Sequence, residues 1–300
     1  MDFAHDGRLA YAVRRVITVR RVQMQRDDIW LRTTDGKRKR IVDGERLVQG
    51  GLPFSYAIQS LRWGPDGKRL TVEMNVRFYT NWERGETEDS FLTLLLDENG
   101  KELKIGRGDG AIQEADNATW LTDGATVVYQ TEAVQPKLLF SLNKVRPLAG
   151  RGSPLFSRHQ FVAVAYDSPR NLAVAVERDS GLSTPPQLVL LDLVKETRKE
   201  LMTLDAYLGK LSVSPSGKKI AYFRNHDTLE IRDLAQLEPP ATVRVAFGEY
   251  GWTAEEDRLL IKRGVERKNS DLLWVQMPAA GQSVTASDSA LSGTPFRAFT

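Results

Sequence analysis

One short motif recurs along the chain and constrains its fold more than any other feature: an apolar strand, a tight turn rich in Gly, Pro and Asp, and a second apolar strand. Its clearest copy is the stretch WGPDGKRLTVEM, residues 63–74. Pro65 presets φ for the turn and Gly67 adopts a positive φ without a Cβ penalty, so these residues specify a β-hairpin. Other copies begin at Phe3, Trp120, Tyr166, Val213 and Trp252. About six copies of one hairpin predict a repeat architecture.

A second hairpin follows each copy. The clearest examples are Ile29-Trp30-Leu31 before Asp35-Gly36, and Phe91–Leu96 before Asn99-Gly100. Four short strands per repeat form the blade of a propeller, and one blade alone cannot bury both faces of its sheet. We therefore predict an all-β fold, a β-propeller of about six four-stranded antiparallel blades in a single domain over residues 1–300. The approximate blades are residues 1–50, 51–110, 111–155, 156–205, 206–246 and 247–300.

Long connections are predicted between the hairpins, whereas the turns within them are tight. The longest predicted loops are residues 14–28, 42–57, 75–90 and 106–117. In an up-and-down blade these loops emerge on one face of the ring, and loops on a rigid scaffold are where binding is usually found. We expect a site on this loop-rich face, near the first three repeats.

Composition excludes several classes of protein. The net charge of +3 is too mild to favour a nucleic acid as partner, and the absence of Cys excludes disulfides and thiolate ligands. No apolar run approaches the roughly 20 residues of a membrane span, so we expect no membrane insertion. The N-terminal residues MDFAHDG show no export signal and begin almost inside a hairpin, so we expect that the chain was trimmed from a longer precursor.

The hairpin pattern of an aromatic residue, Ser or Gly, Pro, Asp, Gly, Lys and a basic residue before an apolar strand resembles the TolB-like propeller repeat. Residues 63–72 and 211–222 match it best. The pattern is similar also to the propeller that precedes the hydrolase domain in the prolyl oligopeptidase family, where residues 28–36 would fit an outer hairpin. The resemblance covers about residues 3–285 and implies a bacterial, periplasmic or otherwise extracytoplasmic β-propeller. Such propellers serve as docking platforms, peptidase gates and enzymes alike.

The chain departs from this pattern at three repeats. The first lacks most of its inner strand. The fourth has its proline shifted to Pro169, and the sixth has Glu255-Glu256 in place of Asp-Gly.

Catalytic and metal-binding patterns are weak. No Gly-x-Ser-x-Gly elbow is present, so no serine peptidase activity is expected from this chain. The three histidines, His5, His159 and His226, occupy unrelated positions of the repeat, so we expect neither a metal site nor a cofactor. The stretch 97–100 is interpreted as a turn rather than a calcium loop, and the glycine-rich stretch 106–110 precedes no helix that would bind phosphate.

Basic residues gather in the first repeat, within residues 14–26 and 37–40. They indicate either an anionic partner or a solvated polar surface, and we favour the second interpretation. No aromatic residues of the kind that stack on bases are interleaved with them.

The stretch 75–90, NVRFYTNWERGETEDS, is the most binding-like segment because it combines aromatic residues with flanking arginines, a composition enriched at interface hot spots. We predict a partner-binding site made of Tyr56, Arg77, Tyr79, Trp82 and Arg84. The alternative, that the rings fold back over the edge of the blade, stays open.

By contrast, Trp63, Trp120 and Trp252 share one position of the repeat and are expected to pack between blades.

The sequence therefore favours a monomeric, non-catalytic scaffold that binds a protein or peptide partner through its loop-rich face. The alternative is a gating propeller detached from a serine peptidase of the prolyl oligopeptidase family. A third class is a propeller hydrolase or lyase with polar groups on the axis.

Overall fold

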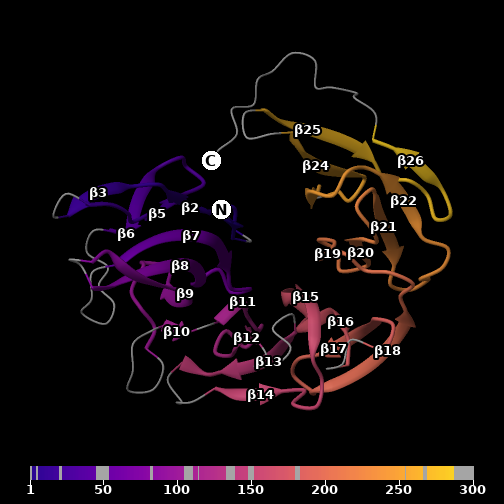
Figure 1. Ribbon diagram of the computed structural model, residues 1–300, viewed down its shortest axis with the longest axis horizontal. Coiled ribbons are helices and arrows are strands. Elements are labelled where there is room, and N and C mark those ends of the chain that lie inside the picture. Colours follow the sequence, from indigo (N-terminus) through magenta and orange to yellow (C-terminus); the bar gives the residue numbers. More distant parts are fainter. Residues whose placement is uncertain are drawn as a thin grey trace. The chain divides into compact units, whose positions relative to one another are not determined.

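The computed structural model describes the chain except residues 1, 5, 20–21, 45–53, 82–83, 105–110, 114, 133–138, 148–151, 180–182, 254, 266–268 and 287–300. The described residues are strands and turns without an α-helix (Figure 1). They divide into two compact units. The first is Met1–Gln160 with the short segments Ser168–Asn171 and Leu193–Glu196, and the second is Phe161–Asp167, Leu172–Asp192 and Thr197–Thr300.

The first unit contains three antiparallel sheets and a separate hairpin. The first sheet has the order β1 (Asp2–Phe3), β2 (Leu9–Val13), β5 (Asp28–Arg32), β6 (Arg38–Val42), and the hairpin β3 (Val16–Val19) and β4 (Val22–Gln25) lies between β2 and β5 in the chain. The second sheet consists of β7 (Phe54–Trp63), β8 (Arg69–Asn81), β9 (Glu86–Asp97) and β10 (Ala111–Gln113) in that order. The third contains β11 (Ala115–Trp120), β12 (Val127–Glu132), β13 (Phe140–Val145) and β14 (Ser153–Leu155).

The second unit repeats this arrangement. One meander is β15 (Phe161–Asp167), β16 (Leu172–Glu177), β17 (Gln187–Asp192) and β18 (Thr197–Thr203), with the 3-10 turn η2 (Ser168–Arg170) between β15 and β16. The next is β19 (Gly209–Val213), β20 (Lys219–Phe223), β21 (Thr228–Asp233) and β22 (Ala241–Arg244), and β26 (Ser283–Thr285) pairs parallel with β22. The last is β23 (Glu249–Trp252), β24 (Arg258–Val265) and β25 (Asn269–Gln276).

The recurring hairpin is confirmed at every predicted copy. The copies form the antiparallel pairs β1–β2, β7–β8, β11–β12, β15–β16, β19–β20 and β23–β24. In β7–β8 the Gly64 N–H donates to the Arg69 carbonyl at 2.8 Å, and Gly67 has a φ of 64°. In the sixth copy Glu256 takes a φ of 56° at the equivalent place, and its carboxylate accepts a hydrogen bond from the Ser216 hydroxyl at 2.9 Å. At this copy, which lacks glycine, the strained backbone of Glu256 thus coincides with a hydrogen bond that holds its side chain.

The tryptophans at the shared repeat position pack in the core, as predicted. Trp63 and Trp120 are buried, and the guanidinium of a residue from the preceding hairpin lies over each ring: Arg8 at 5.1 Å from the Trp63 centroid and Arg69 at 5.4 Å from the Trp120 centroid. Trp252 is partly buried and donates its indole N–H to the Ser212 hydroxyl at 2.9 Å. The same contact type therefore joins successive sheets of the first unit.

Two of the predicted loops are wrong. Residues 75–90 belong almost entirely to β8 and β9, and residues 14–28 include the hairpin β3–β4. The physical reason is that both segments are ribbons with one polar face, so charged side chains on that face obscured the alternation of β-branched and aromatic residues on the other. In the other two predicted loops, β10 and β11 occupy most of the described part of 106–117, and β7 begins at Phe54. The blade boundaries stay a prediction.

Candidate functional site

A surface groove of about 510 Å³ lies in the first unit where β4 borders the extended sheet of β7, β8 and β9. We call it the β8–β9 groove. Its lining residues are Gln23, Gln25, Ser55, Tyr56, Ala57, Asn75, Val76, Arg77, Tyr79, Asp89, Ser90 and Phe91. Three of the five predicted binding residues, Tyr56, Arg77 and Tyr79, line this groove.

The strand register decides which side chains share a face of this sheet. Arg77 of β8 lies opposite Ser55 of β7 and Asp89 of β9, and Asn75 lies opposite Ala57 and Phe91. Directly opposite residues and every second residue along a strand point to the same face. One face therefore presents Ser55, Ala57, Asn75, Arg77, Tyr79, Asp89 and Phe91, and Tyr56, Val76 and Ser90 belong to the other.

Arg77 and Asp89 form a two-bond ion pair on the groove face. Arg77 Nε lies 2.7 Å from Asp89 Oδ1 and Nη2 lies 2.8 Å from Oδ2, although both side chains are more than half exposed. The hydrogen bonds from Arg77 lower the pKa of Asp89, and the same bonds raise the pKa of Arg77. The pair fixes the direction of the guanidinium, and no hydrogen bond joins its Nη1 to another described residue.

Aromatic surface lies on both sides of this ion pair. Phe91 is 59% exposed although it stands in the middle of β9, and Tyr79 is partly exposed two residues along β8 from Arg77. A large apolar ring left in water beside polar groups is typical of a binding surface.

Tyr56 anchors the groove wall. Its ring is buried, and its hydroxyl donates to the Asp27 carbonyl at 2.7 Å. Burial, with the nearby charge of Asp27, raises the pKa of the hydroxyl well above its ordinary value. Ser55 adds a second link, because its hydroxyl bonds both the N–H and the carbonyl of Gln25 at 3.0 Å. Tyr56 thus holds β4 beside β7, and it offers a partner little surface.

The other two predicted residues lie elsewhere. Arg84 stands near the tip of the β8–β9 hairpin, exposed, with Nη1 3.8 Å from Glu86 Oε1, and it does not line the groove. Trp82 lies outside the described residues. Sequence reasoning missed Asp89 and Phe91. Recognising residues 69–97 as one hairpin brings Asp89 and Phe91 close to Arg77 and Asn75. A register shift between Tyr79 and Asn81 sets the exact partners, so counting back from the turn alone would not have found them.

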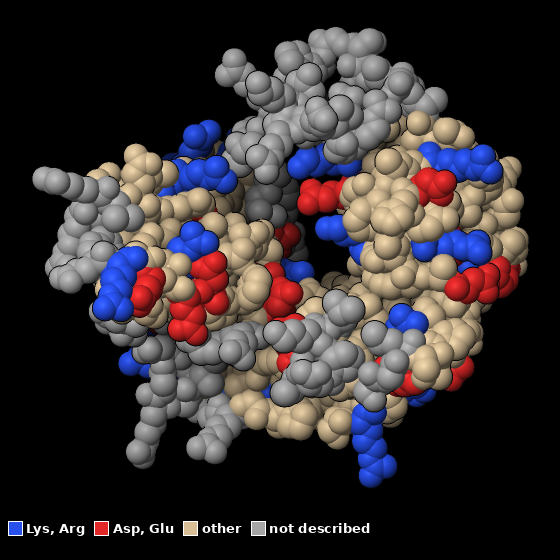
Figure 2. All heavy atoms as spheres, viewed as in Figure 1, with Lys and Arg blue, Asp and Glu red and all other residues tan. Residues whose placement is uncertain are grey.

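Two of the basic residues at positions 37–40 pair with nearby carboxylates. Arg40 lies 3.0 Å from Asp43 and 3.4 Å from Asp28, and Lys37 lies 2.8 Å from Asp35. Basic and acidic side chains of the described residues are interspersed on the face shown in Figure 2. This pairing agrees with the interpretation of residues 37–40 as a solvated surface.

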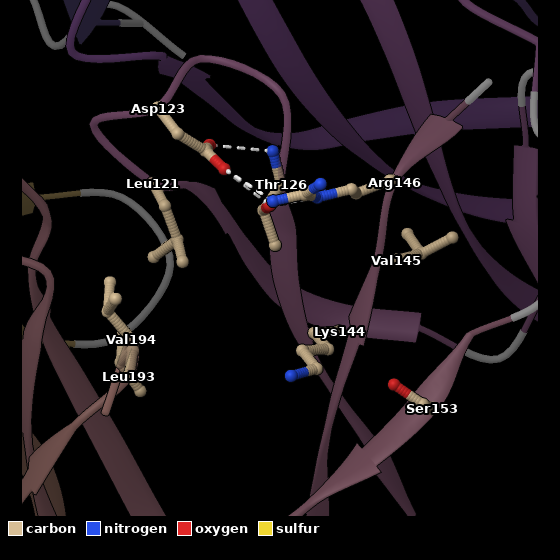
Figure 3. Close-up of a pocket in the computed structure, with 9 residues that line it drawn as sticks. All are labelled: Leu121, Asp123, Thr126, Lys144, Val145, Arg146, Ser153, Leu193 and Val194. Carbon is tan, nitrogen blue, oxygen red and sulfur yellow. Dashed lines mark hydrogen bonds and ion pairs between the residues drawn. The ribbon is translucent and has the colours of Figure 1, made fainter. Parts of the chain in front are cut away.

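A second hollow of about 320 Å³ lies in the first unit, between the β11–β12 turn, the end of β13, β14 and the segment Leu193–Glu196 (Figure 3). Its lining residues are Leu121, Asp123, Thr126, Lys144, Val145, Arg146, Ser153, Leu193 and Val194. None of them was predicted as a site residue, because the hollow joins turns that are distant in the sequence. We call it the Arg146 pocket.

The described histidines are not neighbours in one compact unit: His159 belongs to the first and His226 to the second, where its ring lies 6.2 Å from that of Phe247. His5 lies outside the described residues. Among the described residues, no three His, Asp or Glu side chains gather as metal ligands would. The described part of the chain also holds no helix that could span a membrane.

Comparison by sequence finds no matching protein-family model and no matching curated protein. Comparison by structure finds many similar folds. An oligogalacturonate lyase in complex with manganese matches with a TM-score of 0.55 at 10% identity, over 92% of this chain and 99% of the lyase. The β-propeller domain of the Trilobed protease from Pyrococcus furiosus matches with a TM-score of 0.51 at 15% identity, over 90% of this chain and 78% of that domain.

TolB from Acinetobacter baumannii matches with a TM-score of 0.49 at 13% identity, over 88% of this chain, and the chain spans 61% of TolB's length. The predicted all-β propeller class is confirmed by the sheets described above and by the likeness to the protease domain, and the number of blades stays a prediction. The chain has a β-propeller fold.

Proposed function

We propose that this propeller is a non-catalytic scaffold that binds a protein or peptide partner through the β8–β9 groove. The observation that carries the proposal is the exposed Phe91 beside the exposed, oriented Arg77–Asp89 pair in one groove of about 510 Å³. Aromatic and arginine side chains dominate the energetics of protein interfaces, and rigid strands present these groups without an ordering cost on binding.

In this proposal the apolar and the polar residues of the groove contact different parts of the partner. A partner's apolar side chain covers Phe91 and Tyr79, while its peptide groups meet the amides of Gln23, Gln25 and Asn75. Because Asp89 already occupies two donors of Arg77, the partner contributes an acceptor to Nη1 rather than a carboxylate that would take the whole guanidinium.

A random peptide library tests the proposal directly. Peptides selected on the immobilised wild-type protein should lose binding to the double variant Tyr79→Ala/Phe91→Ala. The control variant Trp274→Ala removes another exposed ring, from β25 in the second unit, and should retain binding. Peptides that bind both variants equally, or a selection that enriches nothing, would contradict the proposal. Equal melting temperatures of the three proteins exclude a trivial loss of fold.

The second candidate is a gating propeller that works beside a serine peptidase domain. The specific observation in its favour is the likeness to the Pyrococcus furiosus protease domain, of which this chain spans 78%. In that case the ring would restrict access of substrates to a domain encoded elsewhere. The reading frame that follows Thr300 tests this: a Gly-x-Ser-x-Gly domain encoded there would favour gating over a free-standing scaffold.

An enzymatic role of the propeller itself is the third possibility, and the manganese-bound lyase fold gives the reason to test it. Elemental analysis of the purified protein after equilibration with Mn²⁺ should find less than one equivalent of bound metal. A stoichiometric metal that survives dialysis would contradict a purely binding role.

The proposed scaffold is a monomer, and its resemblance to TolB-like propellers implies an extracytoplasmic location. Fractionation of cells that express the full reading frame tests the location, and light scattering of the purified protein tests the oligomeric state.

A further inference from the structure

The Arg146 pocket shares no lining residue with the β8–β9 groove, so it constitutes a separate site within the first unit. Figure 3 shows Arg146, Lys144 and Ser153 along one side of the hollow, and Leu121, Leu193 and Val194 along the other. Polar donors thus face an apolar wall across a small space.

Asp123 belongs to the pocket but uses its oxygens within its own turn. Oδ1 accepts hydrogen bonds from the N–H groups of Ala125 at 2.9 Å and Thr126 at 2.8 Å, and Oδ2 accepts one from the Thr126 hydroxyl at 2.6 Å. Although burial opposes ionisation, these bonds keep the pKa of Asp123 below its usual value. The carboxylate is a turn residue with little capacity left for a cation.

The Nε atom of Arg146 is fixed by a hydrogen bond, whereas its Nη atoms are available to a ligand. Its Nε donates to the Thr126 hydroxyl at 3.2 Å, while Nη2 lies 3.6 Å from Asp123 Oδ2, too far for a hydrogen bond. The side chain is 67% exposed, and no hydrogen bond joins its Nη atoms to another described residue. An arginine anchored through Nε presents its two terminal nitrogens as a fork, the geometry that binds a carboxylate by two parallel bonds.

Lys144 and Ser153 extend this donor surface. They are directly opposite in the β13–β14 register, and Lys144 precedes Arg146 by two positions, so the three side chains share a face. Lys144 is paired with Glu196, so its charge is already balanced. Asp123 balances part of the charge of Arg146 across 3.6 Å, but the Nη atoms of Arg146 keep hydrogen-bond donors for a ligand.

The apolar wall indicates that a ligand of this pocket also carries an apolar group. Leu121 and Leu193 are buried, and Val194 is 60% exposed at the rim. Val194 is therefore the part of this wall that a ligand's apolar group can cover and remove from water.

We propose that the Arg146 pocket binds a carboxylate with a small branched apolar group next to it, as in the last residue of a peptide or a free N-blocked amino acid. The carboxylate takes the Nη fork of Arg146 with the Ser153 hydroxyl beside it, and the apolar group covers Val194. A volume of about 320 Å³ suits a ligand of this size.

Titration with N-acetyl-leucine, followed by NMR or calorimetry, tests the chemistry. N-Acetyl-leucinamide lacks the carboxylate and N-acetylglycine lacks the branched group, so both should bind at least tenfold more weakly. Equal binding of the acid and its amide would overturn the proposal, as would resonance changes outside the pocket only. A hexapeptide ending in leucine identifies the source: tighter binding than N-acetyl-leucine indicates a peptide terminus, and weaker binding indicates a free small acid.

Two variants locate the site. Arg146→Gln should weaken binding of N-acetyl-leucine at least tenfold, and Val194→Asp should do the same through the apolar wall. Arg258→Gln is the matched control, because Arg258 is similarly exposed and pairs with a neighbouring carboxylate, Asp257, in the second unit. Retained binding in Arg146→Gln would overturn the proposal. The variant Tyr79→Ala/Phe91→Ala should bind N-acetyl-leucine normally, so failure at one site is distinguishable from failure at the other.

Discussion

Two arginine–carboxylate pairs in this molecule have opposite surroundings. Arg77 and Asp89 meet in solvent on the groove face, whereas Arg232 and Glu230 of β21 meet in the interior of the second unit, with Arg232 Nη2 2.7 Å from Glu230 Oε2. The buried pair also bonds Tyr222 of β20, whose hydroxyl donates to Glu230 at 2.6 Å and accepts from Arg232 Nε at 3.0 Å.

The comparison distinguishes an ion pair that stabilises the packing of strands from one that stays accessible to a binding partner. A buried carboxylate and guanidinium are costly to separate, so the Glu230–Arg232–Tyr222 cluster stays closed and specifies how β20 and β21 pack. An exposed pair contributes little to stability and keeps donors accessible. Arg77 is therefore available to a partner in a way that Arg232 is not, and the same residue types serve different purposes because their burial differs.

The largest expected effect follows from breaking the buried pair. Arg232→Ala removes the nearer of two guanidinium groups that pair with the buried Glu230 and leaves Arg224 Nη1 3.4 Å from its Oε1. We therefore expect the free energy of unfolding to fall by an amount toward the lower end of about 3–5 kcal/mol. Denaturant unfolding measures it. Arg258→Ala, at an exposed pair of the same unit, is the control and should change stability by less than about 1 kcal/mol. A loss as small as the control's would show that the cluster is not the structural element described above.

Removing only the shared hydroxyl gives an intermediate effect. Tyr222→Phe deletes one donor to Glu230 and one acceptor of Arg232, which should lower the free energy of unfolding by about 1–3 kcal/mol. A double-mutant cycle with Arg232→Ala should show strong coupling between the two residues. Additive losses would mean that the tyrosine and the arginine act independently.

At the exposed pair the expected loss of stability is small. Arg77→Ala should change the free energy of unfolding by less than about 1 kcal/mol, yet it should weaken binding of the groove-selected peptides. The same chemical denaturation and a peptide titration measure both quantities on one sample. A destabilisation comparable with that of Arg232→Ala would erase the distinction between the two pairs.

The pH dependence of the exposed pair is the smallest effect. The pKa of Asp89 is lowered in the folded protein, so its contribution to stability is present above the ordinary carboxyl pKa and is lost as the pH falls through the lowered value. NMR titration of the Asp89 carboxyl should find a pKa below the ordinary range in the wild type and a normal one in Arg77→Ala. Equal values in the two proteins would show that the ion pair does not persist in solution.

The sequence predicted the hairpins well because their turns depend on local chemistry. Gly67 supplies the positive φ that its turn requires, and even the sixth copy, where Glu256 replaces glycine, retained enough of the pattern to be recognised. The long hairpin of β8 and β9 was missed because Arg77 and Asp89 suggest a loop when each is considered singly. Only their cross-strand register explains why they stand in strands.

The two candidate sites differ in whether their residues are close together in the sequence. Arg77 and Tyr79 could be selected from sequence because the aromatic and basic residues that mark the groove are neighbours in one segment. Leu121, Arg146 and Val194 could not, because only the folding of separate turns onto one another brings them together, and no single segment carries the pattern.

The parallel pairing of β26 with β22 has a consequence for how the late part of the chain must be treated. Thr242, Val243 and Arg244 lie beside Ser283, Val284 and Thr285, so the final described strand covers the outer rim of a sheet formed some forty residues earlier. A chain cut before Ser283 would leave β22 as an exposed edge strand. Its unpaired N–H and C=O groups could then pair with another copy of the chain. Strand β26 thereby protects this edge of the sheet from aggregation.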